Sequence, residues 1–286
     1  MLNFSILVFN AGSSSLKFAL YEVQTSGGMR LVIRGVVTDV GAKSSLYWSD
    51  GKTEAHIVVE ANNHKQAAEW VLDWLQHLWP FGSLLECLAM VAHRMVHGGT
   101  FFYKPVVITE QVMDKFDSLS ALAPLHNPKS ISVIRATQEK LPAKLLMVAV
   151  FDTAFFQNLP QHSGYALPEC FSHAHGIKRF GFHGLAHQYM MQRFDQLHPR
   201  QQSHRGIISF QLGHGCSVTA ISDGKPLDTS MGFTPLEGLV MATRAGDIDP
   251  GILIYLLKNG HQLDELEQKL NHHSGLLGSS LQVLIV

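Results

Sequence analysis

The chain has 286 residues, 46% of them hydrophobic and 16% charged, which is enough material for two domains with buried cores. Lys and Arg number 22 against 23 Asp and Glu, so no basic excess is present to attract nucleic acid or an anionic membrane. The first apolar stretch ends at Asn10 without a cationic segment before it, too short for a signal peptide or a membrane span. We therefore expect a cytoplasmic protein with no nucleic acid and no membrane as partner.

The first half of the chain predicts a sheet followed by alternating helices and strands. Residues 4–9 and 16–23 are apolar runs that flank the turn Asn10-Ala11-Gly12-Ser13-Ser14-Ser15, and this pattern is typical of a hairpin. Residues 31–40 and 56–59 continue it as an antiparallel meander. Further on, the pattern predicts helices over 65–78, 110–119, 128–140 and 185–197 and strands over 88–96 and 145–151.

This alternation indicates an α/β fold. No linker of low complexity separates the halves, so the pattern places the domain boundary near Asp152, giving domains 1–151 and 152–286. With an offset of 201 residues, Phe9 aligns with Phe210 and Gly12 with Gly213. Either the fold is duplicated around two phosphate-holding turns, or two ordinary hairpins happen to look alike. The sequence repeat by itself leaves both alternatives open.

The turn formed by Gly12, Ser13, Ser14 and Ser15, with Lys17 after it, has the parts of a phosphate cradle: backbone N–H groups, hydroxyls and one cation. The spacing of a Walker motif is absent. A serine-rich hairpin turn is usually only a turn, so this motif is weak when taken singly.

Two arginines are candidates for binding an anion. Arg94 ends an apolar strand just before two glycines, where burial without an anion would be costly. The alternative is a surface arginine beside a glycine turn. Arg244 lies in a similar setting, with a structural ion pair to Asp247 or Asp249 as its alternative.

Three further residues are placed where ligands gather. Asp152 follows an apolar strand, a position that suits a magnesium ligand in open α/β sheets. His183 is flanked by Gly181-Phe182 and Gly184, and His126 lies in a loop bounded by prolines. Either histidine could instead be a satisfied core residue.

Taken together, the motifs resemble the acetate kinase family, within the superfamily that also holds sugar kinases and actin. The resemblance runs in family order from residue 3 to about residue 278. The matching segments are FNAGSSSLKF, AHRMVHGG, APLHNP, VFDTAF, RFGFHG, LGHGCSVTAISDGKPLDTSMGFTPLEGLVM and TRAGDIDPGI.

The resemblance implies roles for individual residues. The groups around the transferring phosphoryl group and the acid would be Arg94, Asp152, His183, Arg244 and His126. The nucleotide phosphates would be bound by Asn10, Ser13, Ser15, Lys17, Gly213, His214 and Gly215. Magnesium would be bound by Asn10 and Asp152, and the methyl group of the acid by Val96, Leu125, Phe182 and Pro235.

The same resemblance implies a duplicated actin-like fold with two domains around a nucleotide cleft, ATP or ADP with Mg²⁺ as cofactors, acetate or another short carboxylic acid as substrate, and a homodimer. The predicted reaction is reversible transfer of the γ-phosphoryl group of ATP to acetate. An inactive remnant, acting at most as a binding or dimerisation module, is the alternative, and propionate is the alternative substrate.

Three departures from the family pattern bear on these expectations. His214 stands where the family has asparagine, and Leu185-Ala186 replaces Thr-Ser. The family also continues past the apolar residues 281–286 with a glycine-rich adenosine segment, a glutamate that serves magnesium and a final helix. We therefore expect an incomplete second domain and doubtful activity.

Overall fold

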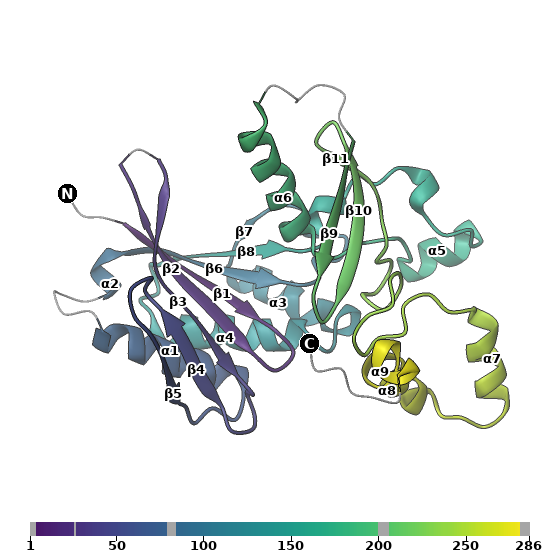
Figure 1. The fold of residues 1–286 in the computed structure, drawn as a ribbon, viewed down its shortest axis with the longest axis horizontal. Helices are drawn as coiled ribbons and strands as arrows, with labels where there is room; N and C mark the ends of the chain where they lie inside the picture. Colours follow the sequence, from purple (N-terminus) through teal and green to yellow (C-terminus); the bar gives the residue numbers. More distant parts are fainter. Residues whose placement is uncertain (1–3, 26, 79–83, 200–205, 281–286) are drawn as a thin grey trace. The chain divides into compact units, whose positions relative to one another are not determined.

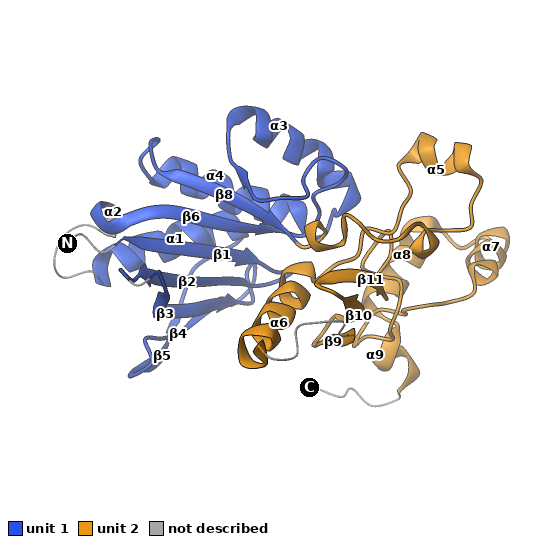
Figure 2. Ribbon diagram, turned by 90° about the horizontal axis from the view of Figure 1, so that it is seen from above, with its two compact units in different colours: residues 1–151 blue, residues 152–286 orange. Residues whose placement is uncertain are grey.

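The computed structural model describes residues 4–25, 27–78, 84–199 and 206–280. The chain divides into two compact units, residues 1–151 and 152–286 (Figure 2). Both units contain helices and strands, so the α/β class predicted from the sequence is confirmed. That each unit is a functional domain with one phosphate turn stays a prediction. The tail of residues 281–286 lies outside the described residues.

Unit 1 is built on a sheet that, within the described residues, has eight strands in the order β5-β4-β3-β2-β1-β6-β8-β7 (Figure 1). Its strands are β1 Ser5–Ala11, β2 Leu16–Val23, β3 Met29–Thr38, β4 Ser45–Ser49, β5 Glu54–Val58, β6 Leu88–Met95, β7 Val106–Val107 and β8 Leu146–Phe151. The predicted hairpin and antiparallel meander are confirmed. The sequence analysis missed β4, whose five residues are too few for a clear two-residue period.

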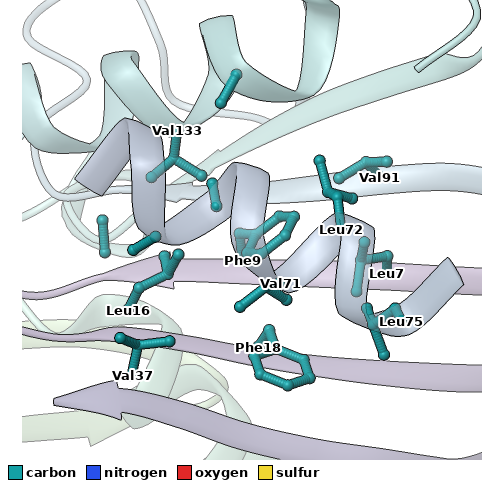
Figure 3. Packing of buried hydrophobic residues seen from close by; sticks show 14 of the residues in the cluster. Leu7, Phe9, Leu16, Phe18, Val37, Val71, Leu72, Leu75, Val91 and Val133 are labelled. Atoms are coloured by element: carbon teal, nitrogen blue, oxygen red, sulfur yellow. The ribbon is translucent and has the colours of Figure 1, made fainter. Parts of the chain in front are cut away.

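The helices of unit 1 are α1 His64–Leu78, α2 Leu84–Cys87, α3 Glu110–Ser118, the short helix η1 Leu119–Leu122 and α4 Asn127–Lys140. Two of them, α1 and α4, cover one face of this sheet. The buried side chains of α1 recur every three or four residues, so one stripe of the helix faces the sheet. Figure 3 shows this stripe, including Val71 and Leu75, packed on Leu7, Phe9 and Phe18. Each such side chain stabilises the fold by about 1.5–3 kcal/mol when fully buried.

The centre of the sheet brings three chemically important positions to one end. The strands β1, β6 and β8 are parallel, so their carboxyl ends meet at the same edge. Asn10 pairs with Arg94 near that edge, and Arg94 pairs with Val150. The last strand ends at Phe151, directly before Asp152. No helix in the described part of the chain is long and apolar enough to cross a membrane.

Unit 2 has a smaller sheet, with the order β11-β10-β9 among its described strands. Its elements are η2 Ala154–Phe156, η3 Gln161–Ser163, α5 Glu169–His175, α6 Gly184–Leu197, β9 Gly206–Leu212, β10 Cys216–Ser222, β11 Lys225–Thr229, α7 Pro250–Lys258, α8 Leu263–His272 and α9 Gly275–Ser279. The helix predicted over 185–197 is confirmed as α6. The sequence analysis assigned no helix to α5, α7, α8 or α9.

The hairpin of unit 1 recurs in unit 2, but with one difference. With the offset of 201 residues, β1 falls on β9 from end to end. The connecting turn has four residues in unit 1 (12–15) and three in unit 2 (213–215). Phe9 is 1% exposed whereas Phe210 is 59% exposed. Phe9 and Phe210 therefore hold equivalent positions in their hairpins but have different side-chain environments, because the two strands bury alternate faces.

Candidate active site

The first turn (residues 12–15) is held through its carbonyl groups by α1 and α4. Nε2 of His64 lies 3.0 Å from the carbonyl oxygen of Gly12, so this nitrogen carries the proton and donates it. The Nζ of Lys129 donates to the carbonyl oxygen of Ser13 at 2.5 Å. Burial lowers the pKa of both side chains, and the charge of Lys129 lowers the pKa of His64 further. The turn is thus clamped by two helices.

The remaining carbonyl groups of this turn are engaged as well. The oxygen of Ser14 accepts from the N–H of Val40 at 3.0 Å, and that of Ser15 from the N–H of Gly12 at 2.7 Å. A Cβ at Gly12 would lie 2.8 Å from the hydroxyl of Ser15, so a side chain there would displace that hydroxyl. No described group accepts a hydrogen bond from the N–H groups of Ser13 and Ser14. The turn therefore presents donors, as a phosphate site requires.

Three of the predicted phosphate and catalytic residues lie side by side on neighbouring strands. Asn10 in β1 pairs with Lys17 in β2 and with Arg94 in β6. Paired residues on adjacent strands present their side chains on the same face of a sheet. Nη1 of Arg94 donates to Oδ1 of Asn10 at 2.8 Å. This contact orients the half-buried guanidinium, which argues against a mere surface arginine.

The remaining predicted residues of unit 1 lie in two loops that the buried Asn127 joins. Val96 is 5% exposed, and Leu125 and His126 are half-buried. The buried side chain of Asn127 accepts from the N–H of His97 at 3.2 Å and donates to its carbonyl oxygen at 3.1 Å. Since His126 directly precedes Asn127, this clamp fixes both loops that carry predicted acid-binding residues.

In unit 2, Asp152 and His183 are joined through the backbone. The N–H of Gly184 donates to the carbonyl oxygen of Asp152 at 3.0 Å, and a Cβ on Gly184 would lie only 2.1 Å from that oxygen. Asp152 is 2% exposed. His183 has a φ of 58°, a left-handed backbone conformation that is rare outside glycine and often marks a functional site. This close approach explains the glycine after His183.

The second turn (residues 213–215) lies against two predicted catalytic side chains. A Cβ on Gly215 would lie 3.5 Å from Nη1 of Arg244 and 3.7 and 3.8 Å from Cε1 and Nε2 of His183. A guanidinium and an imidazole therefore converge on one glycine. Nδ1 of the His183 ring is 2.9 Å from the hydroxyl of Ser217, so this ring is oriented.

Arg244 is not an ion-pair partner of the nearby aspartates. Its Nη1 donates to the carbonyl oxygen of Pro235 at 3.2 Å, and none of the ion pairs in the described residues includes it. Asp247 accepts instead from the N–H of Gly238, and Asp249 caps α7. Burial lowers the pKa of Arg244. The alternative of a structural ion pair is wrong, and a half-buried cation without a carboxylate partner is suited to an anion.

The loop that carries Pro235 is held by a half-buried polar cluster. Tyr165 donates its hydroxyl hydrogen to Glu237, and its oxygen accepts from the N–H of Phe233 at 2.6 Å. Nη2 of Arg179 donates to the other oxygen of Glu237 at 2.7 Å. Burial, together with Glu237, raises the pKa of Tyr165. This cluster fixes the loop and, through the Pro235 carbonyl, supports Arg244.

A magnesium ion would find one suitable carboxylate in unit 2. Among the described residues, no three His, Cys, Asp or Glu side chains lie close enough to hold a metal by themselves. Mg²⁺ usually takes one or two carboxylates and completes its shell with water and substrate phosphates. The buried Asp152 fits that requirement. Asn10 as a second ligand stays a prediction, since its Oδ1 already accepts from Arg94.

The structure thus brings together two groups of predicted residues. Asn10, Lys17 and Arg94 adjoin one another in unit 1. His183, Gly215 and Arg244 adjoin one another in unit 2. That the two groups surround a single phosphoryl group stays a prediction, as does the methyl pocket formed from Val96, Leu125, Phe182 and Pro235.

Five supporting residues were not found by the sequence analysis: His64, Lys129, Ser217, His187 and Glu237. Each acts on a partner far along the chain; Lys129, for example, is 116 residues from Ser13. Of the five, only His187 had a local signal, because it follows His183, the N-cap residue of α6, by four residues, and its N–H donates to the carbonyl oxygen of His183 at 3.0 Å.

Comparison with known proteins gives consistent matches. The sequence profile of the Acetokinase family matches residues 5–282. Acetate kinase from Coprothermobacter proteolyticus is 43% identical over 278 residues, 96% of this chain and 68% of the relative. Acetate kinase from Chloroherpeton thalassium is 40% identical over 291 residues, 96% of this chain and 70% of the relative.

Solved structures agree with the sequence matches. A propionate kinase from Francisella tularensis has a TM-score of 0.85 and 40% identity, with 96% of this chain and 70% of that chain covered. The acetate kinase of Porphyromonas gingivalis has a TM-score of 0.83 and 38% identity, with coverages of 96% and 69%. The profile spans nearly all of the sequence, and the similarity extends to the whole described fold. This chain therefore belongs to the acetokinase family.

Proposed function

We propose that this protein transfers the γ-phosphoryl group of ATP to acetate, giving acetyl phosphate and ADP, and that propionate is an alternative acceptor. The observation that carries the proposal is the convergence of Arg244 and His183 on Gly215, in a turn that the family uses for nucleotide phosphates. A half-buried guanidinium without a carboxylate partner, next to an oriented imidazole, is an arrangement suited to a phosphoryl group.

The reaction does not need a general base. A carboxylate is ionised at neutral pH, so acetate is already nucleophilic. One acetate oxygen forms a bond to the γ-phosphorus, while the bond from that phosphorus to the oxygen shared with the β-phosphate breaks. The electron pair of the broken bond stays on ADP. Catalysis therefore consists of positioning two anions and stabilising charge on the phosphoryl oxygens.

The described residues divide this work among them. The first turn holds nucleotide phosphates through its N–H groups, hydroxyls and Lys17. Arg94, Arg244 and His183 donate to the transferring group and offset the repulsion between the two anions. Asp152 would hold magnesium, which would supply charge neutralisation of the nucleotide phosphates. Val96, Leu125, Phe182 and Pro235 enclose the methyl group of the acid.

The test is formation of acetyl phosphate by the purified chain from ATP, Mg²⁺ and acetate, with propionate in a parallel series. Arg244→Ala is the matched negative control, because it removes one proposed phosphoryl ligand while leaving the half-buried cluster around Glu237 intact. Turnover that is lost in the variant supports the proposal. Nucleotide binding without acetyl phosphate formation in the unaltered chain would instead support a binding module.

A homodimer in the cytoplasm is part of the same proposal. The helix α7 supports dimerisation, because it is largely apolar and none of its residues is buried; Ile252, Ile254 and Tyr255 are 48%, 55% and 66% exposed. Light scattering on the purified chain tests the oligomeric state, and cell fractionation tests the location. A monomer at micromolar concentration would contradict the first part.

A further inference from the structure

A chain of four polar side chains runs beneath the second turn. The Oγ of Ser209 in β9 lies 2.9 Å from Nδ1 of His187, and Nε2 of His187 lies 2.8 Å from the Oγ of Ser217 in β10. The Oγ of Ser217 lies 2.9 Å from Nδ1 of His183. Ser209, His187 and Ser217 are 6%, 1% and 0% exposed, so water does not compete for these hydrogen bonds.

The donors and acceptors of this chain allow only two directions. Ser217 has one hydroxyl hydrogen but contacts two ring nitrogens, so at least one nitrogen must donate to it. If both nitrogens donated, the hydrogen of this buried hydroxyl would have no acceptor among the described residues, so one nitrogen donates and the other accepts. In the first direction, Ser209 donates to His187, His187 donates from Nε2 to Ser217, and Ser217 donates to Nδ1 of His183. In the second direction every donor and acceptor is exchanged.

The Ser209 hydroxyl decides between the two directions. In the first direction its hydrogen is bonded to His187. In the second it accepts from His187, and its own hydrogen has no acceptor, since the described residues offer this hydroxyl no other hydrogen-bond partner. A buried donor without a partner is more costly than a lone pair without one. The first direction is therefore favoured.

We propose that Ser209, His187 and Ser217 are positioning residues that hold the proton of a neutral His183 on Nε2, so that this nitrogen donates a hydrogen bond to the transferring phosphoryl group. The proposal rests on the proposed function, because it takes the ligand of His183 to be that group. Nε2 of His183 belongs to the ring edge beside Gly215 and lies 3.8 Å from the position that a Cβ on Gly215 would take.

The opposite tautomer would impair the reaction. With its proton on Nδ1, a neutral His183 would direct the lone pair of Nε2 at the phosphoryl oxygens. Two electron-rich atoms would then face one another, beside Arg244. The hydrogen-bonded side chains Ser209, His187 and Ser217 prevent this tautomer without adding a second positive charge. Burial supports the arrangement by lowering the pKa of His187 to about 4, which keeps that ring neutral.

The direct test is the tautomer of His183. In the protein labelled with ¹⁵N-histidine at pH 7.5, nitrogen shifts separate protonated from unprotonated ring nitrogens, and the signals are assigned with His183→Gln and His187→Gln. We expect Nε2 protonated in both rings. Ser217→Ala should leave His183 as a mixture of tautomers. Protonation of His183 on Nδ1 in the unaltered protein would overturn the proposal.

Kinetics provide the second readout. Ser217→Ala should lower kcat roughly 10- to 100-fold through misorientation, with the KM for ATP nearly unchanged. Ser217→Thr retains a hydroxyl and should recover part of the rate. Thr219→Val is the matched control, because Thr219 is 1% exposed in the same strand and its hydrogen bond to Thr229 does not belong to the series that ends at His183. An equal loss of kcat in Thr219→Val would show that the loss in Ser217→Ala comes from general destabilisation of the fold and not from the orientation of His183.

The two readouts separate the proposals. The expected tautomer together with a His183→Gln variant of unchanged turnover would contradict the assignment of His183 to the phosphoryl group, while the hydrogen-bond chain would stand. Protonation of His183 on Nδ1 together with normal acetyl phosphate formation would overturn the positioning role of the hydrogen-bond chain and leave the proposed function intact.

Discussion

The two turns that are proposed to hold phosphates are supported in different ways. The first turn (residues 12–15) is fixed through its carbonyl groups, by His64 from α1 and Lys129 from α4. The second turn (residues 213–215) has few such anchors; the carbonyl oxygen of His214 accepts from the N–H of Ala242 at 3.3 Å.

Two candidate catalytic side chains, Arg244 and His183, lie next to the second turn. Lys129 donates to the backbone of the first turn, whereas Arg244 beside the second turn is proposed to act on the substrate. The proposed function therefore gives the two hairpins different tasks: the first holds the nucleotide, and the second lies beside groups that stabilise the transferring phosphoryl group.

The largest difference should appear when one cation is removed beside each turn and the two losses of activity are compared. Arg244→Ala should lower kcat for acetyl phosphate formation about 100- to 1000-fold, the usual cost of losing one donor to a developing charge. Lys129→Ala should lower kcat less than about tenfold, because Lys129 contacts only the backbone of the turn. Initial rates at saturating ATP and acetate measure both. Equal losses in the two variants would remove the distinction between the turns.

A methyl group on the second turn should act on turnover without affecting the fold. In Gly215→Ala the new carbon would lie 3.5 Å from Arg244 and 3.7 Å from His183, which is ordinary contact. It would nevertheless occupy space proposed for the phosphoryl group, so kcat/KM should fall roughly 10- to 100-fold at an unchanged melting temperature.

The neighbouring glycine provides the control for this substitution. In Gly213→Ala the nearest atom to the new carbon is the carbonyl oxygen of Gly215, at 3.7 Å, and no catalytic side chain is near. Its activity should therefore fall much less. If Gly215→Ala also lowered the melting temperature by several degrees, the loss would be one of folding rather than of substrate space.

The histidines behind the turns should make stability depend on pH. Burial lowers the pKa of His187 from 6.5 to about 4 and also lowers the pKa of His64. Below pH 6.5 the unfolded chain binds protons that the folded chain does not, so stability should fall as the pH falls from 6.5 to about 4. Unfolding midpoints at pH 7, 6 and 5 measure this dependence.

The second turn should be the more sensitive to acid. A protonated His64 can still donate from Nε2 to Gly12, whereas a protonated His187 can no longer accept from Ser209. His187→Asn should therefore flatten the pH dependence more than His64→Asn does. A greater flattening by His64→Asn would reverse this order.

The smallest effect is expected at His214, which is exposed in the second turn where the family has asparagine. The imidazole is bulkier than the amide, so His214→Asn should lower the KM for ATP or raise kcat, by about twofold, as is typical of an exposed substitution. Steady-state kinetics with ATP as the varied substrate measure the change. If neither constant changes, the histidine is an accommodated substitution.

The sequence alone determined the elements whose period and punctuation are local. The hairpin of β1 and β2, the helices α1 and α4 and the strand before Asp152 were all predicted within a few residues, because apolar spacing is encoded in neighbouring positions. It also determined the family, since the glycine-rich motifs occur in order along the chain. The short strand β4 escaped because five residues do not establish a period.

Only the tertiary structure decided how the candidate site is supported. Nothing near Ser13 in the sequence predicts Lys129, 116 residues away, and nothing near Gly12 predicts His64, 52 residues away. Ser217 reaches His183 across 34 residues. Such contacts depend on how helices and strands pack, and the side-chain hydrogen bonds that result have no local sequence period. For that reason the sequence could predict the candidate reactive groups, and the fold alone revealed what holds and orients them.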